Sequence, residues 1–257
     1  MSAQPFGCQL RTWRQRRRLS QLELATHAEI SSRHLSFIET GRSSPSRDMV
    51  LHLAARLEVP PRERNQLLVA AGFAPVFPER TLDDPALAAA RRAIDLVLEA
   101  HKPYPAFAVD RRWNIVASNH ALPEIYVGVD PALLVRPVNA LRLALHPGGL
   151  APRIENHAEW RAHLLHDLQR QIELTADPAL VALMTELSAY PAPPLRTAAE
   201  PGAMIVPLRL RVGDTSYALF STTMVFGTPV DVTVSELAVE LFFPADAATA
   251  ARIERVA

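Results

Sequence analysis

The sequence contains a single cysteine, Cys8, among 257 residues. One thiol cannot form an internal disulfide or a thiolate metal site, and scarce cysteine is typical of a reducing compartment. Glycine is also scarce, with nine residues, and the sequence has neither a phosphate-cradling glycine loop nor a Gly-x-Ser-x-Gly nucleophile motif. These absences argue against a disulfide-stabilised secreted protein, a P-loop enzyme and a serine hydrolase.

Long apolar runs are absent as well. No stretch approaches the ~20 apolar residues of a membrane-spanning helix, and no apolar segment follows a basic start as in a signal peptide. We therefore expect a cytoplasmic protein that does not insert into membranes. Since 49% of the residues are apolar, a folded core is expected, and the length fits one large or two ordinary domains.

Nine histidines raise the question of a metal site or of acid–base catalysis. His163 and His166 lie three residues apart on a predicted helix, with Asp167 adjacent. Two ligands without a third at a suitable spacing do not define a metal site. The sequence therefore predicts no catalytic residue, no metal and no cofactor, and we expect the protein not to be an enzyme.

Charge is unevenly distributed along the chain. The formal net charge is zero, yet residues 1–73 carry eleven arginines and six carboxylates, a net +5, which leaves −5 for the remainder. Such a basic first part, attached to an acidic remainder, favours polyanion binding by the first part alone.

The segment from Ser20 to Pro45 has the pattern of two short helices around a tight turn. Ser31 is placed to cap the second helix, in which Leu35 and Ile38 face inward, and Gly41 ends it. Two short helices that meet steeply across three or four residues form a helix-turn-helix. Its second helix enters the major groove of DNA.

The outward face of the second helix carries side chains that suit DNA. An arginine can bind guanine through two hydrogen bonds, serine and histidine are adaptable partners of base edges, and flanking polar residues suit phosphates. A small helical bundle with a solvated polar face is the alternative interpretation. The predicted DNA-binding residues are Gln21, Ser31, Ser32, Arg33, His34, Ser36, Arg42, Ser43 and Ser44.

These positions resemble the lambda-repressor-like, or XRE-type, helix-turn-helix family. The resemblance covers about residues 6–73 and implies an all-α domain of five helices that binds a double-stranded DNA operator, usually as a homodimer. It also implies an ion pair between Glu39 and an arginine of the first helix, for which Arg14 is best placed. The matching residues are Leu19-Ser20-Gln21-x-x-Leu24-Ala25, Ile30-Ser31, Leu35-Ser36-x-Ile38-Glu39-x-Gly41 and Pro45-Ser46.

The pattern becomes mixed in the second part of the chain. Residues 1–73 are predicted to form the DNA-binding domain, 74–84 a linker and 85–257 a second domain. The strand and helix order predicts an α+β domain with a five-stranded antiparallel sheet, and it resembles the PAS architecture. Strands are expected at 105–109, 113–118, 203–212, 215–225 and 230–242, and helices at 85–100, 133–145, 157–174 and 178–190.

The second part also resembles the MmyB-like ligand-binding domain, over about residues 81–253. That family stands behind an XRE-type helix-turn-helix and is associated with a long-chain fatty acid or a similar lipid-like ligand, which the resemblance therefore implies here. The matching residues are Tyr104-Pro105-Ala106, Asp110-x-x-Trp113-Asn114-Ile115-Val116-Ala117-x-Asn119, Leu143-x-Leu145-His146-Pro147-x-Gly149-Leu150, Trp160-Arg161-x-x-Leu164, Phe220-Ser221-Thr222-Thr223-x-Val225-Phe226-Gly227-Thr228-Pro229, Glu236-Leu237 and Phe242-Phe243-Pro244-Ala245-Asp246.

A helical cap over a sheet face can leave an apolar cavity, which is the default ligand site. Aromatic and branched side chains would line such a cavity, and an arginine fork or a histidine could receive a carboxylate head group. Arg153 is a further candidate for that role. The predicted ligand-binding residues are Phe107, Trp113, Arg142, His146, Arg161, Phe220, Thr222, Val225 and Phe226.

The sequence thus predicts a transcription regulator that binds DNA through its first domain. Its second domain is predicted to sense a small apolar or amphipathic effector and to form a homodimer. One alternative remains open, in which the second domain is only a dimerisation or protein-interaction module.

Overall fold

The chain divides into two compact units, the first built on Met1–Arg80 and the second on most of the chain from Thr81 onward. The structure is a computed structural model that describes residues 4–121, 125–192, 206–227 and 231–256. Each unit has its own buried apolar cluster or clusters.

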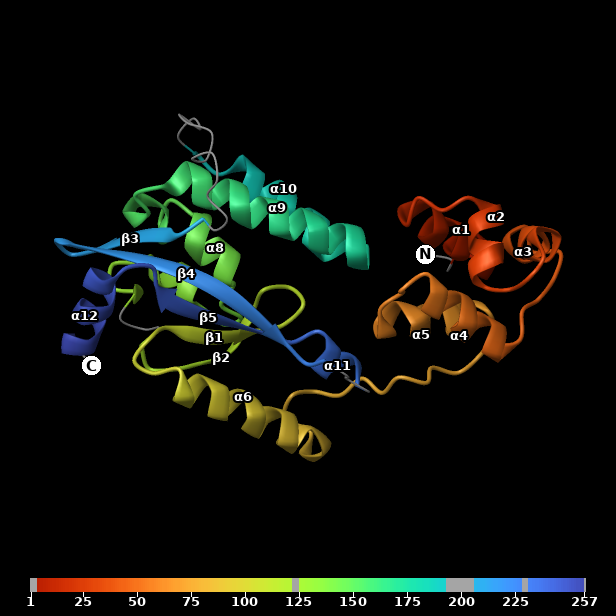
Figure 1. Cartoon of the computed structure of the whole chain (residues 1–257), viewed down its shortest axis with the longest axis horizontal. Coiled ribbons are helices and arrows are strands. Elements are labelled where there is room, and N and C mark those ends of the chain that lie inside the picture. The colour runs from red at the N-terminus through yellow and green to blue at the C-terminus, as the bar shows by residue number, and fades with distance from the viewer. Residues whose placement is uncertain (1–3, 122–124, 193–205, 228–230, 257) are drawn as a thin grey trace. The chain divides into compact units, whose positions relative to one another are not determined.

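The first unit is all-α, as predicted (Figure 1). Its core is made of side chains that are fully buried, among them Leu10, Leu24, Leu35 and Leu53. The five helices are α1 (Phe6–Arg16), α2 (Gln21–His27), α3 (Ser32–Glu39), α4 (Arg47–Arg56) and α5 (Pro61–Ala70).

Local signals fix where α2 and α3 begin and end. The Ser20 hydroxyl accepts a hydrogen bond from the Glu23 amide, and the Glu23 carboxylate accepts one from the Ser20 amide at 2.7 Å, which completes a capping box. Ser31 caps α3 by accepting from the His34 amide. Gly41 follows α3 with φ +74°, a conformation that glycine adopts without strain. The helix-turn-helix geometry is therefore specified largely by local sequence.

The second unit is built on a five-stranded antiparallel sheet, which confirms the predicted fold class. The strand order is β2-β1-β5-β4-β3, so that β5 lies at the centre. The strands are β1 (Ala106–Val109), β2 (Ile115–Ser118), β3 (Leu208–Val212), β4 (Thr215–Val225) and β5 (Ala238–Pro244).

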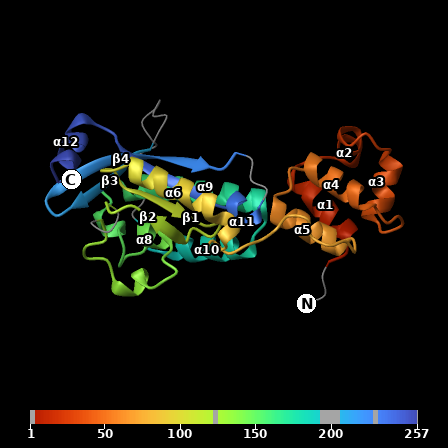
Figure 2. The ribbon, with the colours of Figure 1, turned by 90° about the horizontal axis from the view of Figure 1, so that it is seen from below.

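Helices cover both faces of this sheet (Figures 1 and 2). α6 (Ala88–Ala100) packs against the face that carries Ala106, Ala108 and Val239. On the opposite face lie α8 (Ala140–Leu145), α9 (His157–Thr175) and α10 (Pro178–Ala189). Short helices complete the unit: η1 (Pro85–Leu87), η2 (Pro131–Leu134), η3 (Ala151–Arg153), α11 (Val232–Ser235) and α12 (Ala247–Val256).

Several sequence-based boundaries are wrong, and the strands predicted at 113–118 and 203–212 begin later, at Ile115 and Leu208. The strand predicted at 230–242 begins only at Ala238, because Val232–Ser235 forms a helical turn with backbone bonds from Glu236 to Thr233 and from Leu237 to Val234. A run of β-branched residues favours a strand only weakly, and tertiary context overrides it here. The helix predicted at 133–145 is two pieces, η2 and α8. Residues 203–205 and 230 of the predicted strands lie outside the described residues.

Candidate functional site

The outer face of α3 is the surface predicted to meet DNA. Leu35 and Ile38 are fully buried, which turns the rest of the helix outward. Arg33 is exposed, and Ser32, His34 and Ser36 are half-buried at the same surface. The side chains that carry the hydrogen-bonding capacity are therefore accessible along the N-terminal half of the helix.

The two arginines of this surface, Arg33 and Arg42, contact the same aromatic ring. The guanidinium carbon of Arg33 lies 5.3 Å from the centre of the Phe37 ring, and that of Arg42 lies 5.9 Å from it. Such contacts attract a cation to the ring face and limit the freedom of the arginine side chain. Arg33 and Arg42 are thus held at the same patch although they come from the helix and from the loop that follows it.

The remaining predicted DNA-binding residues have different surroundings. The Gln21 side-chain amide donates to the Glu39 carboxylate at 2.8 Å, so this nitrogen serves the fold. Ser31 uses its hydroxyl as the cap of α3. Ser44 is exposed and Ser43 is half-buried in the loop after α3. Ser43 and Arg42 both donate their backbone N–H to the carbonyl of Phe37, which ties that loop to the helix end.

The second unit contains a cavity of about 220 Å³ between the sheet and helices α8 and α9. Its wall is mostly apolar and aromatic, and a few polar groups are gathered within it. The lining residues are Phe107, Trp113, Ile115, Ile125, Tyr126, Ala140, Leu141, Leu143, Ala144, Leu150, Ile154, Trp160, His163, Leu164, Asp167, Leu208, Leu219, Ser221, Thr223, Glu240 and Phe242. Phe107 and Trp113, both predicted as ligand-binding residues, lie in this wall.

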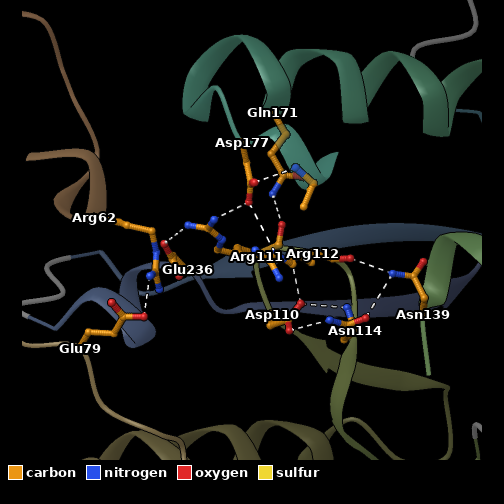
Figure 3. Close-up of polar contacts among 11 residues, drawn as sticks. Arg62, Glu79, Asp110, Arg111, Arg112, Asn114, Asn139, Gln171, Asp177 and Glu236 are labelled. Atoms are coloured by element: carbon orange, nitrogen blue, oxygen red, sulfur yellow. Dashed lines mark hydrogen bonds and ion pairs between the residues drawn. The ribbon is translucent and has the colours of Figure 1, made fainter. Parts of the chain in front are cut away.

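A polar network (Figure 3) holds the turn between β1 and β2 that carries Trp113. Asp110 accepts hydrogen bonds from the backbone of Arg112 and Asn114, and Asn139 donates to the Arg112 carbonyl at 2.7 Å. This turn holds Trp113 at φ +65°.

The indole of Trp113 is anchored to α9. Its Nε1 donates to Gln171 Oε1 at 2.7 Å, and Gln171 Nε2 donates back to the Arg111 carbonyl at 3.0 Å. A bulky residue at positive φ is uncommon and persists only where its surroundings fix it. The hairpin turn and α9 therefore jointly orient one wall of the cavity.

Seven of the nine predicted ligand-binding residues do not line this cavity, and four of the seven lie on β4 or just after it. Side chains alternate along β4, and Leu219, Ser221 and Thr223 point into the cavity. Phe220 and Thr222 alternate with them on the other face, where Phe220 stacks on Phe243 with ring centres 5.3 Å apart. Val225, at the end of β4, is 62% exposed, and Phe226 packs with the cluster under α6.

The cationic side chains predicted to receive a carboxylate lie outside the cavity wall. Arg142 donates two hydrogen bonds to the Glu186 carboxylate, at 2.8 and 2.7 Å. Arg161 donates to the carbonyls of the last turn of α10, and Arg153 donates to the Ile125 carbonyl at 2.6 Å. His146 accepts from the Gly148 amide and packs edge-on against a tyrosine ring. Each of them has a structural partner within the second unit.

The buried acid of the cavity is Glu240, which sequence reasoning missed. It lies in the middle of the central strand β5, opposite Phe107 on β1 and Thr223 on β4, and is only 6% exposed. Thr223 Oγ1 donates to its Oε1 at 2.8 Å. A single carboxylate within the apolar run of residues 238–243 was the signal that could have found it.

The surroundings of Glu240 favour its neutral form. Burial raises the pKa of Glu240 to about 7, the hydrogen bond from Thr223 lowers it, and the nearby charge of Asp167 raises it. Asp167 and His163, one turn apart on α9, also line the cavity, with 3.4 Å between His163 Nε2 and Asp167 Oδ2. Two of the polar side chains in the cavity wall are thus acids, and none of the described lining residues is an arginine or a lysine.

The described residues contain neither a candidate metal site nor a candidate membrane-spanning helix. Within residues 4–121, 125–192, 206–227 and 231–256, no three His, Cys, Asp or Glu side chains gather in a way that could hold a metal ion. No helix in those same ranges has both the length and the apolar character needed to cross a membrane.

A helix-turn-helix unit followed by an α+β unit with an internal apolar cavity defines the class of transcription regulators that carry a ligand-binding domain. Residues 5–67 match the family described as helix-turn-helix domain, and residues 90–256 match the MmyB-like transcription regulator ligand binding domain. The chain belongs to this MmyB-like family of transcription regulators, as the sequence resemblance implied. Transcription regulator families of this kind are not typically enzymes.

A curated relative is similar to part of the chain. It is the uncharacterized HTH-type transcriptional regulator RghRB of Bacillus subtilis (strain 168), 43% identical over 76 residues. The match covers 29% of this chain and 52% of the relative, so the chain spans about half the length of the curated relative it matches.

Proposed function

We propose that this chain is a one-component transcription regulator. Its helix α3 enters the major groove of a DNA operator, and its second unit binds a small apolar or amphipathic effector. The observation that supports DNA binding is the accessible face of α3, on which Arg33 and Arg42 both contact the Phe37 ring. The formal charge of +5 in residues 1–73 supports attraction to the phosphate backbone.

The proposal that the second unit binds an effector rests on its cavity. A cavity of about 220 Å³ lined by aromatic and branched side chains is costly to leave empty and suits an apolar body. An effector preferred by one arrangement of the protein would shift operator affinity by linkage, with a coupling of roughly 1–3 kcal/mol. A long-chain fatty acid, a homodimer and a PAS-like grouping of the second unit remain predictions from the sequence.

The test has two parts. Selection from random double-stranded DNA should recover a near-palindromic operator, and fluorescence anisotropy then gives its affinity at several salt concentrations. Native mass spectrometry of the purified full chain, followed by extraction, identifies any bound small molecule. Operator affinity that is the same with and without that molecule would refute the proposed effector role, and failure to enrich any DNA sequence would refute the proposed DNA binding.

One observation favours a protein-interaction role for the second unit. Leu96 on α6 is 71% exposed, whereas Ile94 and Leu98 of the same helix are buried. A second copy of the chain that covered α6 would remove this leucine from water, which would favour the contact. Sedimentation of the Leu96→Glu variant tests this second candidate, since a dimer that depends on α6 should dissociate.

A further inference from the structure

The polar part of the cavity is poorly suited to an anionic ligand. Among the described residues that line it, the ionisable groups are Glu240, Asp167, His163 and Tyr126, and there is no arginine or lysine. Arg142, Arg153 and Arg161 are held by partners outside the wall. A carboxylate inserted here would lie near two acids. The one basic side chain among the described residues of the wall, His163, already lies 3.4 Å from Asp167, which Arg170 approaches from outside the wall at 3.9 Å.

Glu240 is a buried part of the cavity wall. It is 94% buried on the central strand, and among the described residues the Thr223 hydroxyl is its one hydrogen-bond donor, at Oε1. The second carboxylate oxygen therefore has no donor from the part of the chain that the structure describes. A buried carboxylate without a full set of donors is unfavourable, so a hydrogen-bond donor on a ligand would stabilise the ionised form of Glu240.

The wall around this acid suits a cation with an apolar body. Trp113, Trp160, Tyr126 and Phe107 present aromatic rings in the same cavity, and ring faces attract ammonium groups. The Tyr126 hydroxyl is buried with no hydrogen-bond partner in the described chain, so it offers a second polar contact. The volume, about 220 Å³, lies below the roughly 300–1,000 Å³ of pockets for drug-sized ligands and indicates a small molecule.

We propose that this cavity recognises a small apolar amine, whose protonated nitrogen binds Glu240 and Asp167 while its alkyl or aryl body contacts the aromatic wall. The inference rests on the proposed effector role of the cavity and specifies the chemistry of the effector. In a site of low dielectric, opposite charges attract more strongly than in water, and like charges repel more strongly. The same cavity therefore discriminates against carboxylates of equal size.

Three probes of matched length test the head group: n-octylamine, octan-1-ol and octanoate, each titrated calorimetrically into the full chain at about pH 7.5. We expect the amine to bind most tightly and octanoate most weakly. Glu240→Gln should weaken binding of the amine by about tenfold or more and leave binding of the alcohol nearly unchanged, because a neutral amide offers the ammonium no opposite charge. Glu99→Gln removes the same charge at an exposed site on α6 and should change none of the three.

The pH dependence separates the proposal from its main competitor. An ammonium needs ionised Glu240, so amine affinity should rise between about pH 6 and 8, whereas a carboxylate that shares a proton with Glu240 would bind more weakly over the same range. Asp167 and His163 from α9 also face this acid. Because Glu240→Gln keeps both of them, any pH dependence of amine binding that remains in this variant comes from groups other than Glu240.

Octanoate that binds as tightly as octylamine, an amine affinity untouched by Glu240→Gln, or no binding of octylamine at about 1 mM would each overturn the amine inference. Binding of the alcohol or of octanoate alone would leave the effector proposal standing. Ala144→Leu, which fills the cavity, should weaken every probe that binds there. A probe unaffected by Ala144→Leu binds elsewhere and counts against the inference.

Discussion

The Arg14 guanidinium donates two hydrogen bonds to the Glu39 carboxylate, Nε to Oε1 at 2.7 Å and Nη2 to Oε2 at 2.9 Å. The Glu39 side chain has no exposed area, and Gln21 and Arg11 donate to the same carboxylate. The pair confirms the expectation drawn from the helix-turn-helix resemblance. It joins the last residue of α3 to α1 and α2, so it fixes the angle at which α3 is presented.

Glu39→Ala should destabilise the first unit by about 3 kcal/mol, because it leaves the buried Arg14 without its counter-ion. Hydrogen exchange measured peptide by peptide in the full chain should show lost protection in α1 and α3. Peptides of β5 in the second unit should be unchanged. Asp48→Ala, at the exposed start of α4, is the control and should cost less than about 1 kcal/mol. Equal losses in both variants would contradict a specific role of the pair.

The same pair should contribute to the pH dependence of stability. Burial raises the pKa of Glu39, but the hydrogen bonds from Arg14 and Gln21 and the charge of Arg14 outweigh it and hold the pKa below its usual value. Since the pKa is depressed in the folded state, this contribution is present above about pH 4.5 and is lost as the pH falls further. Glu39→Gln should remove that loss in acid titrations followed by hydrogen exchange, and an unchanged acid profile would argue against it.

Gly7→Ala should loosen the packing of α1 against the end of α3. A Cβ at position 7 would lie 2.5 Å from the carbonyl oxygens of both Ile38 and Glu39, which are backbone atoms and cannot rotate away. Overpacking of this kind costs roughly 1–3 kcal/mol. Thermal unfolding of Gly7→Ala should show a lower midpoint for the transition of the first unit. Cys8→Ala, an exposed change on the same helix, should leave that midpoint unchanged. A Gly7→Ala protein as stable as Cys8→Ala would show that α1 can shift freely.

Arg33→Ala and Arg42→Ala should weaken DNA binding in different ways. An arginine that binds a guanine edge contributes about 1–3 kcal/mol of discrimination at one base pair. Arg33→Ala should therefore lower the affinity for the operator more than the affinity for random DNA. Arg42→Ala should weaken both and reduce the salt slope by about 1, as expected for a phosphate contact. Anisotropy titrations at three salt concentrations measure both effects.

The control for these two variants is Arg56→Ala, which removes an exposed arginine of α4. It should leave discrimination between operator and random DNA unchanged. If Arg33→Ala lowered affinity for both DNAs by the same factor, its assignment to a base edge would have to be withdrawn.

Glu240 should make the second unit less stable as the pH rises. Its pKa is raised from 4.5 to about 7, so the folded state holds a proton that the unfolded state releases, and stability falls between these values. From about pH 5 to 8, wild type should lose roughly 2–3 kcal/mol relative to Glu240→Gln in urea unfolding. Glu99→Gln, an exposed change on α6, should follow the wild-type profile. Parallel profiles of wild type and Glu240→Gln would contradict the burial of a titrating acid.

The recognition helix could be predicted from the sequence because its signals are local. The cap Ser31, the inward residues Leu35 and Ile38 and the stop at Gly41 lie within eleven positions, and each acts on its immediate neighbours. Even the contact between Glu39 and Arg14 follows from a family pattern. The cavity has no comparable local signature, and this is where sequence reasoning placed residues on the wrong face.

The sequence by itself determined most of the secondary structure. It predicted the five helices of the first unit, the helix-turn-helix with its exposed arginine, and the five antiparallel strands of the second unit. Only the tertiary structure decided which side of β4 meets the cavity. Both faces of the sheet are covered by helices, so the polarity of Leu219, Phe220 and Thr223 does not distinguish them. It also decided that Arg142 pairs with Glu186, 44 residues away, and that Glu240 takes the buried polar position, since partners distant in the chain meet only after folding.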